Sequence, residues 1–114
     1  MEDLLIATIE TLGYPVRRQG SFASDETYPD DFFTYWNNAS DDGSHYDNAA
    51  TSTIWDFDVN FYSISTARTY SELMRCKKAL KDVGFIISGK GYDVMSDEPT
   101  HTGRGMNALF LETN

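Results

Sequence analysis

The chain has 114 residues, with 18 acidic and nine basic side chains, a formal net charge of −9 at pH 7 and a single cysteine. This length predicts one domain, and one cysteine excludes an intramolecular disulfide. The acidity argues against specific nucleic-acid binding, because nucleic-acid binders present basic patches to phosphates. No apolar run reaches the roughly 20 residues of a membrane-spanning helix, so we expect no membrane partner.

The negative charge is concentrated in one contiguous third of the sequence. Between Gln19 and Ala67 there are nine acids and no lysine or arginine, whereas the rest of the chain has nine of each sign. This third is also rich in aromatic residues, so it is expected to fold with its rings inside and its carboxylates on a surface. A surface of one charge sign repels DNA.

Residues 2–12 have the periodicity of an amphipathic helix. Leu4, Leu5, Ile9 and Leu12 fall on one stripe of such a helix. Gly13 follows the last of them and is suited to the left-handed conformation that ends many helices.

Residues 65–83 predict a second helix. Thr69 and Glu72 match a capping box at its start, and Gly84 is placed to end it. The residues expected on its buried stripe are Leu73, Cys76, Leu80 and Val83. The residues expected on its outward face, which we call the basic helix face, are Arg75, Lys77, Lys78 and Lys81. This face is a candidate subunit interface.

The clearest strand is 54–62, where large apolar residues alternate with Asp56, Asp58 and Asn60. Alternation with period two puts the apolar set on the core face and the acids on the other face, which indicates an antiparallel sheet with one solvated side. Asp56 and Asp58 therefore form a candidate solvated or interface-facing acidic face. The other strands are predicted at 16–22, 32–37, 85–88, 91–94 and 106–112.

Three polar segments separate the predicted strands: 23–31, Asn38–Thr51 and Met95–Gly105. The second is long for a hairpin loop, and long loops in compact domains are often functional. We take the second and third as candidate contact loops. Their polar candidates for contact with partners are Asp41, Asp42, His45, Asp47, His101 and Arg104.

The predicted fold class is α+β. Two amphipathic helices packed on one face of a small, largely antiparallel sheet, in a single two-layer domain spanning 1–114, form the simplest arrangement of these elements.

No catalytic, cofactor or metal site is expected. The segment 41–48 does not have the spacing of a calcium loop, and one cysteine with two scattered histidines does not supply a zinc site. Gly89-Lys90-Gly91 and Gly103-Arg104-Gly105 do not have the spacing of phosphate loops, so tight turns are expected there. We expect a non-enzymatic protein.

Nearly the whole chain resembles a family of small neck and tail proteins of long-tailed bacteriophages and of prophages of Gram-positive bacteria, the tail terminators or tail-completion proteins. The residues that carry the resemblance are Gly13-Tyr14-Pro15, Gln19-Gly20-Ser21, Tyr28-Pro29-Asp30, Phe32-Phe33-Thr34-Tyr35-Trp36-Asn37, Trp55-Asp56-Phe57-Asp58-Val59-Asn60-Phe61-Tyr62, Gly84-Phe85 and Gly91-Tyr92-Asp93-Val94.

The resemblance implies a structural virion protein that is assembled in the host cytoplasm and located in the tail or neck. It implies a homohexameric ring that caps the tail tube, contacts the tube protein, joins the head connector and lets DNA pass through its centre. In such a ring Asp56 and Asp58 are candidate acidic lumen or interface residues, and the loops Asn38–Thr51 and Met95–Gly105 are candidate axial-contact loops. The resemblance carries over no catalytic residue. Two alternatives stay open: a head-completion or connector protein of the same neck, and a small acidic module that imitates DNA and binds a basic groove.

Overall fold

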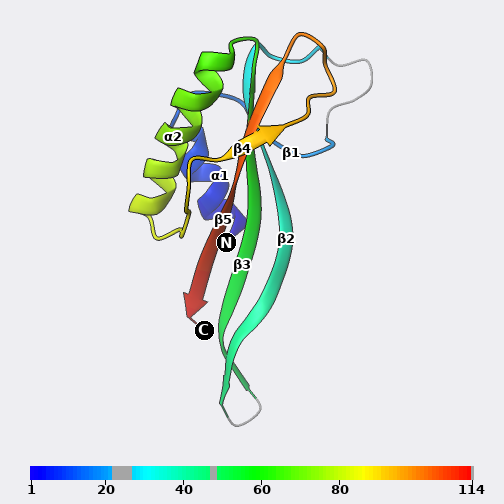
Figure 1. Cartoon of the computed structure of the whole chain (residues 1–114). Helices are drawn as coiled ribbons and strands as arrows, with labels where there is room; N and C mark the ends of the chain where they lie inside the picture. The colour runs from blue at the N-terminus through cyan, green and yellow to red at the C-terminus, as the bar shows by residue number, and fades with distance from the viewer. Residues whose placement is uncertain (22–26, 47–48, 114) are drawn as a thin grey trace.

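The computed structural model describes residues 1–21, 27–46 and 49–113, and within these ranges gives the backbone alone at 42–46 and 49–51. The described part is an α+β domain with two helices and a five-stranded, mostly antiparallel sheet (Figure 1). The elements in chain order are α1 (Glu2–Glu10), β1 (Val16–Arg18), β2 (Asp31–Tyr46), β3 (Ala49–Ser63), α2 (Thr66–Asp82), β4 (Tyr92–Val94) and β5 (Thr102–Thr113).

The strands lie in the order β1-β2-β3-β5-β4. The short β1 runs parallel to β2, and all other neighbouring strands are antiparallel. Both helices pack on one face of the sheet (Figure 1). The predicted fold class is therefore confirmed.

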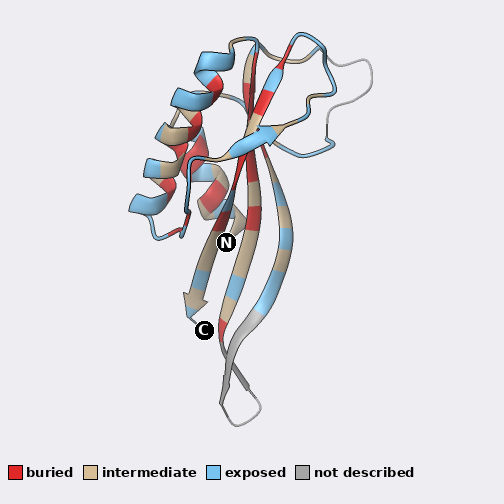
Figure 2. Cartoon of the chain, in the orientation of Figure 1, coloured by how far each residue is buried: buried red, intermediate tan, exposed pale blue. Residues whose placement is uncertain are grey.

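The hydrophobic core lies between the helices and the sheet, where the buried residues gather (Figure 2). β3 contributes its apolar alternate residues to this core, and β5 contributes Met106 and Ala108 from the neighbouring positions of the register. The fully or almost fully buried members are Leu5, Ile9, Phe33, Phe57, Val59, Phe61, Leu73, Cys76, Leu80, Phe85, Ile87, Met106 and Ala108. The alternation predicted for 54–62 and most of the predicted stripe of α2 are confirmed.

Helix α2 begins differently from the prediction but ends as predicted. Ser65 is the N-cap, and its hydroxyl accepts a hydrogen bond from the Arg68 backbone N–H. The predicted capping box at Thr69 is wrong, because Thr69 lies one turn inside the helix, where its buried hydroxyl donates to the Thr66 carbonyl. At the other end Gly84 has φ +110° and the Phe85 N–H bonds to the Leu80 carbonyl, which confirms the predicted Schellman-type ending.

The predicted loop Asn38–Thr51 is wrong: β2 and β3 continue through most of it as one long antiparallel hairpin (Figure 1). The polar, turn-forming residues are accommodated at irregularities of the ladder, between Asn37 and Ala39 and between Asp42 and Ser44. A bulge absorbs an extra residue without ending a strand. The hairpin extends well beyond the helices, and the molecule measures 53 × 28 × 22 Å.

The predicted loop Met95–Gly105 is also too long, because β5 already begins at Thr102. Two glycines that suggested a turn lie inside this strand, so the expected tight turn at 103–105 is wrong. A Cβ at Gly103 would come within 2.7 Å of the Tyr62 ring, and one at Gly105 would overlap Asn60 Oδ1. These glycines let side chains of β3 lie across β5. In contrast, the predicted strand 16–22 is shortened to β1.

Candidate functional site

Asp56 and Asp58 project from the face of the sheet that the helices leave uncovered, because their neighbour Phe57 is buried on the other face. Asn107 on β5 lies beside both acids. Its Nδ2 donates to Asp56 Oδ1 at 2.5 Å and lies 3.4 Å from Asp58 Oδ1. Asn38 Nδ2 also donates to Asp56 Oδ1, at 3.2 Å. Since these donors are neutral amides, they hold the carboxylates without neutralising their charge.

Apolar side chains surround these acids, which sequence reasoning did not anticipate. Trp36 is directly opposite Asp58 in the β2–β3 register and is 43% exposed, with the Arg18 guanidinium 5.1 Å from its ring centroid. Tyr92 of β4 is 46% exposed, and its phenol pKa is raised by partial burial and by the negative charges of Asp58 and Asp56. The negative charges of both carboxylates therefore act on the same Tyr92 phenol.

We call this surface the free face. Its defining residues are Trp36, Ile54, Ile86, Asp56, Asp58, Tyr92, Asn107, Leu109 and Leu111. The signal for Trp36 was present in the sequence: it alternates with Phe33 and Tyr35, so it falls on the side opposite the core.

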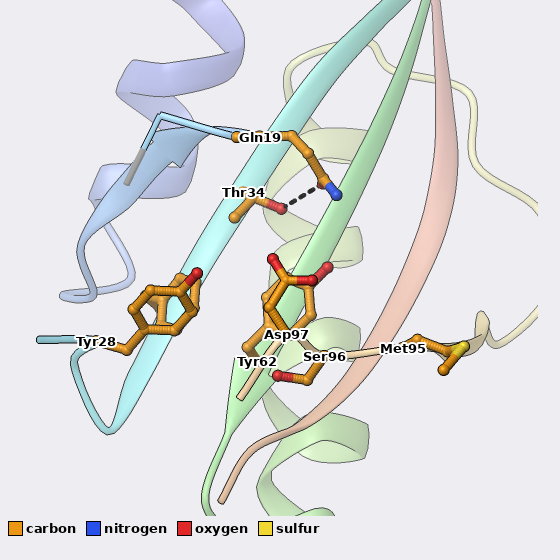
Figure 3. Close-up of a pocket in the computed structure, with 9 residues that line it drawn as sticks. Gln19, Tyr28, Thr34, Tyr62, Met95, Ser96 and Asp97 are labelled. Atoms are coloured by element: carbon orange, nitrogen blue, oxygen red, sulfur yellow. Dashed lines mark hydrogen bonds between the residues drawn. The ribbon is translucent and has the colours of Figure 1, made fainter. Parts of the chain in front are cut away.

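At the β1 end of the same side of the sheet, two connecting segments border a pocket of about 220 Å³ (Figure 3). Tyr28 stands on one side and Asp97 lies beside Tyr62 on the other. The Gln19 side-chain oxygen accepts hydrogen bonds from Thr34 Oγ1 and Asn60 Nδ2, both at 3.1 Å. This pocket could not be predicted from the sequence, because four separate segments assemble it.

Tyr62 forms the floor of that pocket and is almost buried. Burial raises the pKa of its phenol, while hydrogen bonding with Gln19, Thr34 and Asn60 acts in the opposite direction. The phenol therefore stays protonated at neutral pH. A protonated phenol in this pocket can both donate and accept hydrogen bonds.

The basic helix face lies on the opposite side of the molecule from the free face. Arg75, Lys78 and Lys81 are exposed, and Lys77 is half-buried with its ammonium on the Gly89 carbonyl. Arg75 pairs with Glu72 at 2.8 Å, and Lys78 with Asp82 at 3.4 Å. A shallow groove of about 300 Å³ runs between Met74, Lys77, Lys78, Lys81 and Asp82. Val83, predicted on the buried stripe, is exposed instead.

His101 and Arg104 are not projecting loop residues. His101 is buried, with Nε2 2.7 Å from the Pro29 carbonyl oxygen and Nδ1 3.0 Å from Thr100 Oγ1. Arg104 lies within β5 and is held by Asp93 and Tyr70. The physical reason is the same for both: each side chain ties one connecting segment to the sheet, so neither points outward.

Three of the other loop candidates lie in strand β2 of the hairpin. Asp41 is exposed on β2, opposite Ile54 of β3. Asp42 and His45 belong to β2, where the structure gives the backbone alone. The backbone at Asp41, Asp42 and His45 is therefore part of a strand and not of a closed loop. The fourth candidate, Asp47, lies outside the described residues.

Within residues 1–21, 27–46 and 49–113, no three His, Cys, Asp or Glu side chains come together as a metal site. Cys76 is buried in the core, and burial raises the pKa of its thiol to about 12. Such a thiol is not a nucleophile at neutral pH.

No protein-family model matches the chain, and a search of curated proteins found no match. Neither helix in the described part of the chain has the length and apolar character that crossing a bilayer requires.

Proposed function

We propose that this protein is a non-enzymatic structural subunit of the neck of a long-tailed phage, a tail terminator that closes into a ring on the tail tube. The observation that carries the proposal is the free face. It is a wide, helix-free sheet surface on which exposed aromatic and aliphatic residues surround two carboxylates. Contiguous exposed apolar patches mark interaction sites, and the long hairpin extends this surface beyond the body of the domain.

The charge distribution supports assembly around DNA rather than binding to DNA. Asp56 and Asp58 have neutral amide partners, so their field is not cancelled locally. Acids near the channel of a ring repel phosphates and let DNA slide through without adhering. Acids that a neighbouring subunit covers serve the ring in a different way, because they set the register of neighbouring copies.

The test is arrest of tube growth. The purified protein is added to polymerising tail-tube protein, and tube lengths are measured by negative-stain electron microscopy. A terminator shortens the tubes and gives each a cap at one end. Unchanged tube lengths together with copurification on filled heads would indicate the head-connector alternative. A stable monomer that neither caps tubes nor binds heads would contradict both neck assignments.

A further inference from the structure

The free face carries most of the large apolar side chains that are exposed in the described part of the chain. Of the nine large apolar side chains that are exposed among the described residues, five lie there: Trp36, Ile54, Ile86, Tyr92 and Leu111. Leu111 is 55% exposed and lies directly opposite Ile54 in the β3–β5 register. Burial of these side chains against another protein would contribute a favourable free energy of association, because it removes apolar surface from water.

The electrostatics of the free face restrict what can cover it. Asp56 and Asp58 lie at its centre, and they act together on the Tyr92 phenol. β3 and β4 contain no lysine or arginine, and Arg104 of β5 is turned to the helix side, where it contacts Tyr70. Two cations lie at the margins of the face: Arg18 reaches over Trp36 at one edge, and Lys90 lines a pocket with Ile86 and Tyr92 at the other. The partner surface should therefore be basic where it meets Asp56 and Asp58.

A basic surface of suitable kind is present on the same molecule. α2 carries five lysines and arginines against two acids, Glu72 and Asp82. Lys81 is exposed and lines a shallow groove, to which Met74 contributes an apolar side chain. The basic helix face thus offers cations around an apolar strip, which complements carboxylates surrounded by apolar side chains.

The two surfaces lie on opposite sides of the two-layer domain, since α2 covers one face of the sheet and the free face is the other (Figure 1). One copy therefore cannot bring its own two surfaces into contact. Between two copies the contact is heterologous, because it joins different surfaces of the two subunits. Heterologous contacts propagate from copy to copy and either close into rings or continue as filaments. A symmetric dimer through two free faces would instead oppose carboxylate to carboxylate, which is unfavourable.

We propose that the subunit contact of the assembly joins the basic helix face of one copy to the free face of the next, with Lys81 of the first facing the Asp56–Asp58 pair of the second. This inference rests on the proposed ring. It specifies which surfaces meet, and it leaves the hairpin tips available for other partners.

The test uses two charge reversals, Asp58→Lys and Lys81→Glu, with Glu10→Lys on the exposed surface of α1 as the matched control. Assembly is followed by sedimentation velocity at low salt, and folding by circular dichroism. Each reversal alone should raise the dissociation constant of the contact about tenfold or more. An equimolar mixture of the two variants should assemble again, because each copy then meets a neighbour of opposite charge.

The outcomes separate this inference from the ring proposal. Rings that form equally well with both reversals would overturn the inference and leave the ring. Reversals that act as expected on open filaments would keep the contact and remove the ring. Tighter association of Asp58→Lys alone would indicate the symmetric dimer, and loss of tube binding with unchanged self-association would assign the free face to the tube protein. Either result would overturn the inference, as would a protein that stays monomeric with and without tail tubes.

Discussion

Replacement of Arg104 with alanine should destabilise the domain by about 2–3 kcal/mol. The guanidinium donates to the carbonyls of Lys90 and Gly91 at 3.0 and 3.1 Å, and to Asp93 at 3.0 Å. Its Cζ lies 4.1 Å from the Tyr70 ring centroid. These contacts join β5, the β4 segment and α2, although the sequence suggested a residue available to a partner.

The magnitude follows from the individual contacts. Each hydrogen bond to a carbonyl contributes about 1 kcal/mol, and the cation–π contact about 0.5–2 kcal/mol. The ion pair adds little, at most about 1 kcal/mol, because Asp93 is 87% exposed. Arg104 Nε is buried without a partner in the described part of the chain, and removal of this atom returns about 1 kcal/mol.

The assay is equilibrium urea denaturation followed by tryptophan fluorescence. Arg75→Ala is the control, because Arg75 is exposed and pairs with Glu72 along α2; it should cost at most about 0.5 kcal/mol. The midpoint of Arg104→Ala should fall with an unchanged slope. If Arg104→Ala were as mild as the control, Arg104 would not be a structural clamp, and the reasoning from its contacts would fail.

Three further results are expected. Ser65→Ala should lower the free energy of unfolding by about 1 kcal/mol and Ser65→Asp should largely restore it, because Ser65 is the N-cap; an equal loss in both variants would contradict a capping role. Gly105→Ala should lower the thermal midpoint by several degrees, since its Cβ would overlap Asn60 Oδ1, and the double variant with Asn60→Ala should recover part of that loss. The free energy of unfolding should fall as pH rises above about 9. Between this pH and the folded pKa of about 12, the Cys76 thiol is ionised in the unfolded chain but stays protonated in the folded one, which favours unfolding. Cys76→Ala should reduce this pH dependence without abolishing it, since the phenol pKa values of Tyr14, Tyr62 and Tyr92 are also raised.

The parts of the fold that were predictable depend on strong local patterns. Strict alternation around Phe57 fixed both the core side of β3 and the outward side of Asp56 and Asp58. A glycine at the end of α2 marked its termination, because residue 84 needs a positive φ. Both features are local, so no tertiary information was required.

The parts that were not predictable depend on contacts between distant segments. Asn38, Asp42 and Gly43 have the composition of a turn, yet pairing of β2 with β3 makes them part of a ladder with bulges. Arg104 follows a glycine in a polar stretch, and only the approach of Tyr70 and the 90–93 segment shows that it is enclosed. The apolar composition of the free face likewise emerged only when β2, β4 and β5 were placed beside β3.

Electron microscopy of the protein assembled on the end of a tail tube, at a resolution that shows the secondary structure of each subunit, decides whether this protein caps the tube as a ring. We expect a closed ring in which α2 of every subunit packs against the free face of the next. A tube end without a ring of this protein, or a protein that remains monomeric beside intact tubes, would contradict it.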